Sequence, residues 1–199
     1  VDTERFKPIT IPPKKTPIIG FVGRTDQQKA PDLLLNAALN LVRSGCEFNL
    51  QILGSRFYGT HQCDSYQQTL SSLIGRLEKY GVQIHRPGFV GRLALPRILA
   101  NADINVVPSR WDDPCPLTVL EGMATGQATV VAKCGGMPEQ VGDAGMLFER
   151  DNVFELESIL EKLLSDSFLK QVYAMKARER ALQRTWVVVL RELLEIINF

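Results

Sequence analysis

The chain has 199 residues, 45% of them hydrophobic and 23% charged, a composition typical of a globular protein with a packed core. Its formal net charge of +1 creates no strong field that would favour nucleic acid or an anionic membrane. No apolar run reaches the length of about 18 residues that a membrane-spanning helix needs. We therefore expect no nucleic-acid partner and no membrane span.

The first 17 residues are rich in proline and lysine and predict an extended linker. From residue 18 onward, short apolar runs alternate with segments of helical periodicity. The predicted strands cover residues 18–23, 48–54, 82–90, 103–109, 128–132 and 145–149. The predicted helices cover residues 31–45, 65–80, 92–101, 117–125, the end of 134–142, and then 153–165, 167–182 and 186–197.

Strands that alternate with helices predict a parallel sheet covered on both faces. Right-handed crossovers favour an α/β fold with a Rossmann-like, doubly wound parallel sheet of about six strands. Such sheets bind ligands outside the carboxyl ends of their strands. The candidate residues there are Arg24 and Lys29 after the first strand, Ser109 and Asp113 after the fourth, and Gly135 and Gly136 after the fifth.

Two cations, Arg24 and Lys29, share the loop after the first strand. A guanidinium fork and an ammonium point charge that converge in one loop are able to hold a diphosphate. The alternative is a solvated loop that carries two ordinary surface charges.

The segment 106–126 ends a strand, turns sharply through prolines and continues as a short helix, 117–125. Leu117, Leu120 and Ala124 form the predicted packed stripe of this helix, and Glu121 shares it. A carboxylate on a packed stripe is costly unless something pairs with it. Glu121 is therefore predicted either to reach toward the turn that holds Asp113 and meet a ligand, or to cap a local backbone group.

Other chemistries find no support in the sequence. The chain has neither G-x-G-x-x-G after the first strand nor G-x-x-x-x-G-K-[ST], which argues against NAD and against a P-loop. It has no G-x-S-x-G motif. The cysteines form no CxxC pair and have no histidine at metal-ligand spacing, so we expect free thiols in a reducing cytoplasm. These are Cys46, Cys63, Cys115 and Cys134, and the two isolated histidines are His61 and His85.

Several segments together resemble a known family. FVGR followed by Lys29, then PGFVG, ADINVVPS, LEGMATG and VVAKCGGMPEQV occur in the family's order along nearly the whole chain. They resemble the C-terminal, donor-binding domain of a retaining GT-B glycosyltransferase of family 4, the glycosyl transferases group 1. The resemblance implies that this chain is one half of a GT-B fold and that a missing N-terminal domain binds most of the acceptor and carries a catalytic-site histidine.

The resemblance also implies site residues. The family's acid pair, E-x7-E, falls on Asp113 and Glu121, so that Glu121 holds the ribose hydroxyls and Asp113 contacts the donor sugar. Arg24 and Lys29 neutralise the departing diphosphate. Residues 88–90 line the base, residues 116–118 supply helix N-terminal donors, and the two glycines after the fifth strand mainly shape their turn. The full set of implied donor-binding residues is Gly23, Gly88, Phe89, Val90, Ser109, Pro116, Leu117, Thr118, Gly135 and Gly136.

The chain departs from the family pattern at a few positions. Asp113 is one methylene shorter than the usual Glu, and Cys115-Pro116 replaces the frequent Phe-Gly. Pro116 has no N–H, which removes one backbone donor next to the sugar and phosphate. Ala30 replaces a common Gly, Ala128 replaces a common Pro, and the loop 55–66 is longer than usual.

The predicted organisation is a hinge or linker at 1–17, a nucleotide-sugar-binding domain at 18–185, and a helical ending at 186–199 that packs on the missing domain. The start at Val1 rather than Met predicts an excised fragment or a processed chain. The predicted function is hexosyl transfer from a nucleoside-diphosphate sugar with retention, without cofactor or metal, and this half alone turns over little. The alternatives are a non-catalytic nucleotide-sugar-binding module and a phosphorylase on the same fold.

Overall fold

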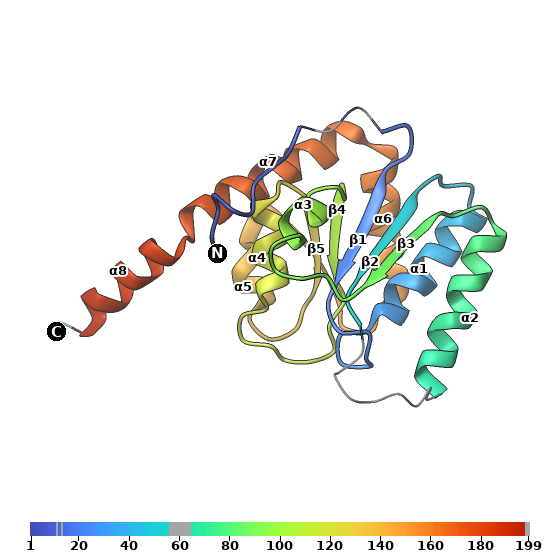
Figure 1. Ribbon diagram of the computed structural model, residues 1–199, viewed down its shortest axis with the longest axis horizontal. Coiled ribbons are helices and arrows are strands. Elements are labelled where there is room, and N and C mark those ends of the chain that lie inside the picture. The colour runs from blue at the N-terminus through green and yellow to red at the C-terminus, as the bar shows by residue number, and fades with distance from the viewer. Residues whose placement is uncertain (11, 13, 56–64, 198–199) are drawn as a thin grey trace.

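The computed structural model describes residues 1–10, 12, 14–55 and 65–197. Within these ranges the chain forms a six-stranded sheet in the order β3-β2-β1-β4-β5-β6 (Figure 1). All neighbouring strands pair in parallel, which confirms the predicted doubly wound α/β sheet. The strands are β1 Ile18–Val22, β2 Asn49–Leu53, β3 Ile84–Gly88, β4 Ile104–Val107, β5 Ala128–Ala132 and β6 Gly145–Phe148.

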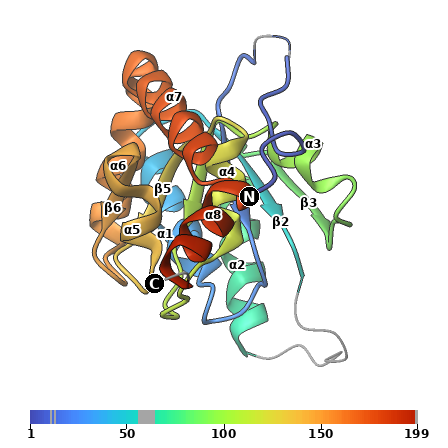
Figure 2. The same cartoon turned by 90° about the vertical axis from the view of Figure 1, so that its left-hand side faces the viewer.

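Helices cover both faces of the sheet. The helix α1 packs against α2 and α6, whereas α4 packs against α5 and α7 (Figures 1 and 2). The helices are α1 Pro31–Arg43, α2 Ser65–Lys79, α3 Leu95–Leu99, α4 Leu117–Ala124, α5 Met137–Val141, α6 Val153–Ser165, α7 Ser167–Gln183 and α8 Trp186–Ile197, with a 3₁₀ turn at Gly142–Ala144. The predicted order of elements is confirmed, and the differences are shifts of a few residues at the ends of elements.

The strand order reverses between β1 and β4, which lie side by side in the middle of the sheet. The chain builds β2 and β3 on one side of β1, and then crosses to β4 and builds β5 and β6 on the other side. The chain therefore leaves the carboxyl ends of β1 and β4 toward helices in different layers, α1 and α4, and the crevice at this point is where doubly wound sheets bind ligands. Strands β4 and β5 are buried along their whole length and form the centre of the core.

The helix α4 lies very close to the sheet. A Cβ at Gly122 would stand 2.1 Å from Nδ2 of Asn105, so a glycine is required where α4 passes β4. The amide of Asn105, which is fully buried, donates to the carbonyl of Thr118 at 3.2 Å. A strand side chain thus fixes the first turn of α4 over the carboxyl end of the sheet.

The predicted linker, 1–17, begins with a segment that packs on the domain. Val1 and Phe6 are buried, with 6% and 7% of their surface exposed. The guanidinium of Arg178, on α7, donates to the carbonyls of Thr3, Phe6 and Ala124 at 3.2, 2.9 and 2.7 Å. This arginine ties the beginning of the chain to α4 and α7.

At the other end, α8 extends away from the body of the domain (Figure 1). None of its residues is buried, although it is strongly amphipathic. Its apolar residues Trp186, Leu190, Leu193 and Ile197 are between 49% and 64% exposed. Within the described ranges, no helix combines the length and apolarity that crossing a bilayer requires.

Candidate functional site

The two loops at the strand reversal meet through one ion pair. Nζ of Lys29, in the loop after β1, lies 2.8 Å from Oδ2 of Asp113, in the loop after β4. The side chains are 21% and 25% exposed, so the pair is partly shielded from water. Both ends are held locally, because the N–H of Lys29 donates to the carboxylate of Asp26 at 3.0 Å and the other Asp113 oxygen accepts from the N–H of Cys115 at 3.2 Å.

The ion pair with Lys29 lowers the pKa of Asp113. Burial raises the pKa of Asp113, but the hydrogen bond and charge of Lys29 outweigh burial and hold it below its usual range. The N–H of Cys115 and the charge of Arg24 act in the same direction. Asp113 is therefore ionised at neutral pH in the folded protein, and its charge offsets that of Lys29.

Arg24 belongs to the same cluster. Its Nε pairs with Asp26 at 2.7 Å and its Nη2 donates to the side chain of Gln28 at 2.8 Å. These partners lie within its own loop, yet its charge acts on Asp113 across the gap. The structure thus brings Arg24, Lys29 and Asp113 together, as the positions after β1 and β4 predicted. Gly23 lies beneath the cluster, since a Cβ there would stand 3.8 Å from the side chain of Lys29.

Glu121 lies on α4 and is half-buried. Burial raises the pKa of Glu121 above its usual range, and the positive charge of Arg92 offsets this only in part. Among the described residues, no side chain or backbone group hydrogen-bonds its carboxylate, so the predicted alternative of a local backbone cap finds no contact. The charge that acts on it most strongly comes from Arg92, beyond β3, and Glu121 is not drawn into the cluster of Lys29 and Asp113.

One expectation for α4 is wrong. Leu117 was predicted on the packed stripe, but it is 46% exposed. It is the first residue of the helix, where α4 has not yet reached the sheet, and the buried face begins at Val119. Leu120 and Ala124 are buried as predicted, at 8% and 0% exposure.

The start of α4 offers backbone donors. Pro116 is the N-cap and has no N–H, and the N–H of Val119 bonds back to the carbonyl of Pro116 at 3.1 Å. The first N–H groups of a helix have no partner within it, so those of Leu117 and Thr118 are the donors that remain in this turn. Anions favour such a position, since the helix dipole places partial positive charge there.

The two glycines after β5 are required by close packing. Gly135 has a left-handed backbone with φ 51°, and a Cβ there would stand 2.3 Å from the carbonyl oxygen of Asp113. A Cβ at Gly136 would stand 2.0 Å from the carbonyl oxygen of Pro114. The N–H of Gly136 donates to the carbonyl of Asp113 at 2.9 Å. Both glycines thus shape and support the turn that carries Asp113.

The other residues predicted to contact the donor differ in burial and lie after two different strands, β4 and β3. Ser109 is fully buried, and its hydroxyl oxygen lies 3.1 Å from the carbonyl of Gln28 and 3.2 Å from that of Trp111, so its one proton is shared between the two loops. Gly88 ends β3, and its carbonyl accepts from the N–H of Gly54 at 2.8 Å. Phe89 follows at the same edge of the sheet and is 64% exposed, and Val90 next to it is half-buried.

Sequence reasoning missed an ion-pair network beside the site. The guanidinium of Arg110, directly after Ser109, pairs with Asp32 in the first turn of α1 and with Asp151 after β6. The hydroxyl of Tyr66, at the start of α2, donates to Asp32 at 2.5 Å. The only sequence signal was an arginine at the end of β4 and an acid at the start of α1, which are 78 residues apart.

Three of the four cysteines lie in the described part of the chain and are free thiols: Cys46, Cys115 and Cys134. Burial raises the pKa of the Cys134 thiol to about 11, so it is not a reactive thiolate at neutral pH.

His85 is exposed on β3. His61, Cys63 and most of the loop 55–66 lie outside the described residues. No group of three or more His, Cys, Asp or Glu side chains in the described ranges is arranged to hold a metal ion.

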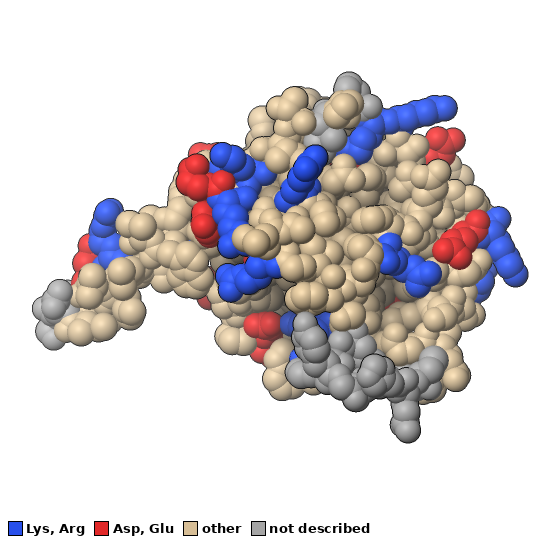
Figure 3. Space-filling view, in the orientation of Figure 1, with Lys and Arg blue, Asp and Glu red and all other residues tan. Residues whose placement is uncertain are grey.

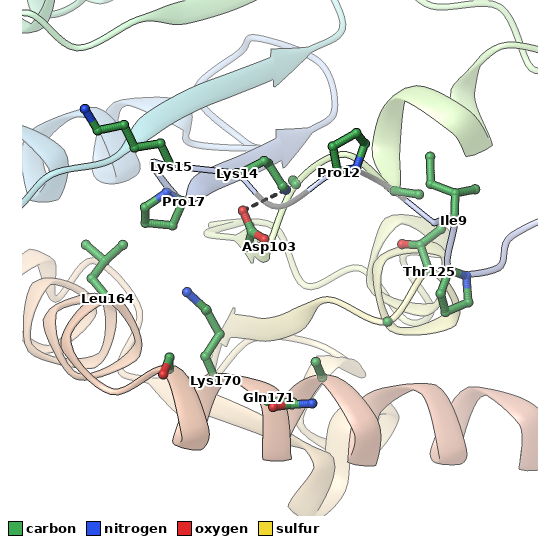
Figure 4. Close-up of a pocket in the computed structure, with 16 residues that line it drawn as sticks. Ile9, Pro12, Lys14, Lys15, Pro17, Asp103, Thr125, Leu164, Lys170 and Gln171 are labelled. Carbon is green, nitrogen blue, oxygen red and sulfur yellow. Dashed lines mark hydrogen bonds and ion pairs between the residues drawn. The ribbon is translucent and has the colours of Figure 1, made fainter.

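A large cavity lies at the amino ends of the strands, opposite the candidate site. It has a volume of about 580 Å³ and is lined by residues that precede β1 and β4, among them Lys14 and Asp103, whose side chains pair at 2.9 Å (Figure 4). Lys170 extends into it from α7 and Lys15 points away (Figure 4). Because it lies at the amino ends of the strands, it is separate from the candidate site.

On the face of the molecule seen in Figure 1, basic side chains are dispersed and several lie beside acidic ones (Figure 3).

Comparison with known proteins identifies the family. Residues 2–181 match the family Glycosyl transferases group 1. The chain is 27% identical over 167 residues to spore coat protein SA of Bacillus subtilis, which covers 82% of the chain and 44% of that protein. It is 30% identical over 165 residues to glycogen synthase of Thermodesulfovibrio yellowstonii, which covers 82% of the chain and 31% of that protein. The chain therefore spans less than half the length of these relatives.

Solved structures share the fold. The C-terminal domain of the glycosyl transferase group 1 family protein LpcC from Francisella tularensis superimposes with a TM-score of 0.75 at 24% identity, covering 92% of this chain and 97% of that one. HepE from Anabaena, solved in complex with UDP, has a TM-score of 0.74 at 23% identity and covers 92% of this chain and 49% of that one. This chain belongs to the glycosyl transferases group 1 family, and its sheet is the C-terminal half of a GT-B fold.

Proposed function

We propose that this chain is the donor-binding half of a retaining hexosyltransferase that uses a nucleoside-diphosphate sugar. The observation that carries the proposal is the arrangement at the reversal of the strand order. A cation and an acid, Lys29 and Asp113, face each other there. The half-buried carboxylate of Glu121 lies on α4, which follows the loop that carries Asp113, and none of the described residues hydrogen-bonds it or forms an ion pair with it. Relatives named as glycogen synthase and D-inositol 3-phosphate glycosyltransferase, and a structural neighbour solved with UDP-glucose, support a sugar-nucleotide donor.

Each side chain has a role in this proposal. Lys29 and Arg24 stabilise the negative charge that grows on the departing diphosphate as the bond between the sugar and its oxygen breaks. The N–H groups of Leu117 and Thr118 add the positive end of a helix to the same charge. Glu121 accepts hydrogen bonds from the two ribose hydroxyls, which replace the water that its burial has removed. Asp113 accepts from hydroxyls of the donor sugar.

The ion pair between Lys29 and Asp113 adds a requirement to this mechanism. Lys29 cannot give its full charge to a diphosphate while Asp113 neutralises it. Binding of the donor therefore shifts Lys29 toward the phosphates and leaves Asp113 as an acceptor for sugar hydroxyls. The ion pair between the two loops is thus replaced by contacts of Lys29 with the phosphates and of Asp113 with the sugar. The sugar is held between the two side chains.

The proposal extends to the parts of the protein that this chain does not contain. An N-terminal domain binds the acceptor and faces the carboxyl ends of the strands. Residues 1–17 enter the donor-binding domain as the hinge, residues 18–185 form that domain, and the exposed apolar side of α8 packs on the other half. The transfer uses no metal and no cofactor.

Calorimetry tests the binding half of the proposal. The intact protein is titrated with UDP, GDP and ADP and with their common sugar conjugates, and the nucleotide that binds also raises the melting temperature. Incubation of the bound conjugate with a panel of acceptors follows. Transfer with retained anomeric configuration supports the proposal, whereas absence of binding to all three nucleotides refutes it.

One observation favours the alternative function, a non-catalytic nucleotide-sugar-binding module. Pro116 leaves the turn beside Asp113 without one backbone donor. The same titration separates the two functions, because the module binds a conjugate but yields neither transfer nor hydrolysis. A phosphorylase on this fold differs from both, since it consumes orthophosphate and ignores the nucleotides.

A further inference from the structure

Arg110 lies in the loop that also carries Asp113, but its side chain pairs with Asp32 and Asp151 rather than with Lys29 or Asp113. Its two terminal nitrogens each donate to the carboxylate of Asp32 at 2.8 Å, which is a bidentate pair. Its Nε donates to Asp151 at 2.5 Å, and Nη1 also donates to the carbonyl of Gln27 at 3.2 Å. Bidentate guanidinium–carboxylate pairs fix orientation as well as distance, which a lysine cannot reproduce.

The segment from Ser109 to Trp111 also hydrogen-bonds Gln28, in the loop after β1. The carbonyl of Gln28 accepts from the N–H of Arg110 at 2.8 Å and from the N–H of Trp111 at 3.3 Å. It also accepts from the buried hydroxyl of Ser109 at 3.1 Å. Gln28 immediately precedes Lys29, so these contacts fasten the base of the lysine side chain to the loop that carries Asp113.

The residue on the other side of Lys29 is under strain. Ala30 has a left-handed backbone with φ 52° and ψ 47°, a conformation that residues with a Cβ disfavour. Such a residue persists only where its surroundings impose the conformation. Asp26 holds the turn from within, since its carbonyl accepts from the N–H of Ala30 at 3.0 Å. Arg110 holds it from the opposite loop, through Gln27 before Ala30 and Asp32 after it. Tyr66 supports Asp32 from the far side through its 2.5 Å hydrogen bond.

We propose that Arg110 is a positioning residue for Lys29. By clamping both sides of the strained turn at Ala30 to the loop after β4, it sets the separation of Lys29 from Asp113 and aims the ammonium at the ligand space between them. Arg110 does this without touching the donor. The consequence for diphosphate binding rests on the proposed function, whereas the effect on the ion pair does not.

A titration without ligand tests the clamp directly. In the intact protein with ¹³C-labelled aspartate, NMR follows the carboxyl of Asp113 against pH. The groups that face it are Lys29, the N–H of Cys115 and Arg24. If Arg110→Gln loosens the loop, Lys29 withdraws and the pKa of Asp113 rises toward its usual range. The shift is calibrated with Lys29→Gln, which removes the charge altogether.

Three further variants make the result specific. Lys14→Gln breaks an ion pair of similar exposure at the opposite edge of the sheet and should leave the pKa of Asp113 unchanged. Asp32→Asn leaves Arg110 in place and weakens its fork, together with the hydrogen bond from Tyr66, so it gives a smaller shift in the same direction and serves if Arg110→Gln does not fold. Arg110→Lys keeps the charge and is expected to restore only part of the wild-type value. An Asp113 pKa that is the same in wild type, Arg110→Gln and Asp32→Asn overturns the proposal.

Binding of inorganic pyrophosphate supplies the second readout. Arg110→Gln is expected to weaken binding by roughly tenfold, and most of this loss should vanish when Lys29 is already Gln, because contacts that act through one another are not additive. Full additivity of the two substitutions overturns the positioning role. If wild type binds neither pyrophosphate nor any nucleotide, the proposed function fails, and the titration of Asp113 still decides the clamp.

Discussion

Nζ of Lys29 and Oδ2 of Asp113 lie 2.8 Å apart, although the two residues are 84 positions apart in the sequence. Each lies in a loop that leaves the carboxyl end of one of the two central strands, and their charges neutralise each other. In the proposed function, a phosphate competes with Asp113 for Lys29, and a sugar hydroxyl competes with Lys29 for Asp113. The pair would then link the two halves of donor recognition, and this can be tested from either side.

Replacement of Lys29 tests the cation. Lys29→Ala should lower kcat roughly 10²- to 10³-fold, because one preorganised donor to the leaving group is lost. Lys14→Ala is the matched control, since Lys14 forms an ion pair at 2.9 Å and is 23% exposed, against 2.8 Å and 21% for Lys29. Steady-state transfer assays on both variants check this, and equal kcat values for the two would contradict the role of Lys29.

Replacement of Asp113 should separate phosphate from sugar. Asp113→Asn keeps the shape but removes the charge that competes for Lys29, so we expect tighter binding of inorganic pyrophosphate together with a large loss of transfer. Calorimetry and a transfer assay measure the two effects. Weaker pyrophosphate binding in this variant would show that Asp113 supports Lys29 rather than competing with the ligand.

Asp113 also makes a prediction for acid stability. Its folded pKa lies below its usual range, so it stabilises the folded state above that range and this stability is lost as pH falls through the folded pKa. Asp113→Asn should therefore reduce the dependence of the unfolding free energy on pH between the usual carboxyl pKa and more acidic values. Urea unfolding at a series of acidic pH values measures this, and an unchanged slope would argue against a native ion pair.

Glu121 should behave in the opposite way. Its folded pKa is raised by burial, so the folded state holds the proton more tightly and stability falls as pH rises from the usual glutamate pKa through the raised value. At pH 7 Glu121→Gln should thus melt at a higher temperature than wild type. It should also bind a nucleoside diphosphate more weakly by about 1.5–3 kcal/mol, the worth of a hydrogen bond to a charged group.

The control for Glu121 is the ligand rather than a second variant. Inorganic pyrophosphate has no ribose, so its affinity for Glu121→Gln should equal that of wild type. Melting curves at pH 7 and parallel titrations with both ligands give the result. A variant that loses affinity for pyrophosphate as well would place Glu121 at the phosphates and contradict its assignment to the ribose.

The glycines behind Asp113 make a prediction about packing. Gly136→Ala would bring a Cβ within 2.0 Å of the carbonyl oxygen of Pro114 and should destabilise the fold by about 1–3 kcal/mol. Gly75→Ala, in α2, meets no atom within 4 Å and should stabilise by about 0.5–1 kcal/mol through helix propensity. Chemical unfolding of both variants measures the difference, and similar free energies would show that the turn adapts.

The exposed side of α8 tests the proposed domain arrangement. If another domain covers it, Leu190→Glu should destabilise the intact protein by about 1.5–3 kcal/mol, the worth of one buried leucine. The control is Phe168→Glu on α7, at a position that is 75% exposed and where we expect little change. Thermal unfolding of both variants decides, and a Leu190→Glu protein as stable as wild type would leave α8 without a partner.

The sequence by itself determined the elements and their order, because the signals are local. Strands β4 and β5 are almost entirely apolar, as strands buried on both faces must be, and Pro31 starts α1 where its missing N–H costs nothing. Right-handed crossovers then place the ends of β1 and β4 at one edge of the sheet, which is enough to nominate Lys29 and Asp113.

Only the tertiary structure decided which of those residues meet. The order β3-β2-β1-β4-β5-β6 puts β4 beside β1, and this adjacency pairs Lys29 with Asp113 and brings Arg110 to Asp32. The exposure of Leu117 also depends on where α4 first reaches the sheet, which helical periodicity cannot register. Periodicity records neighbours three or four residues apart, whereas these contacts join loops about 80 residues apart and exist only once the sheet has formed.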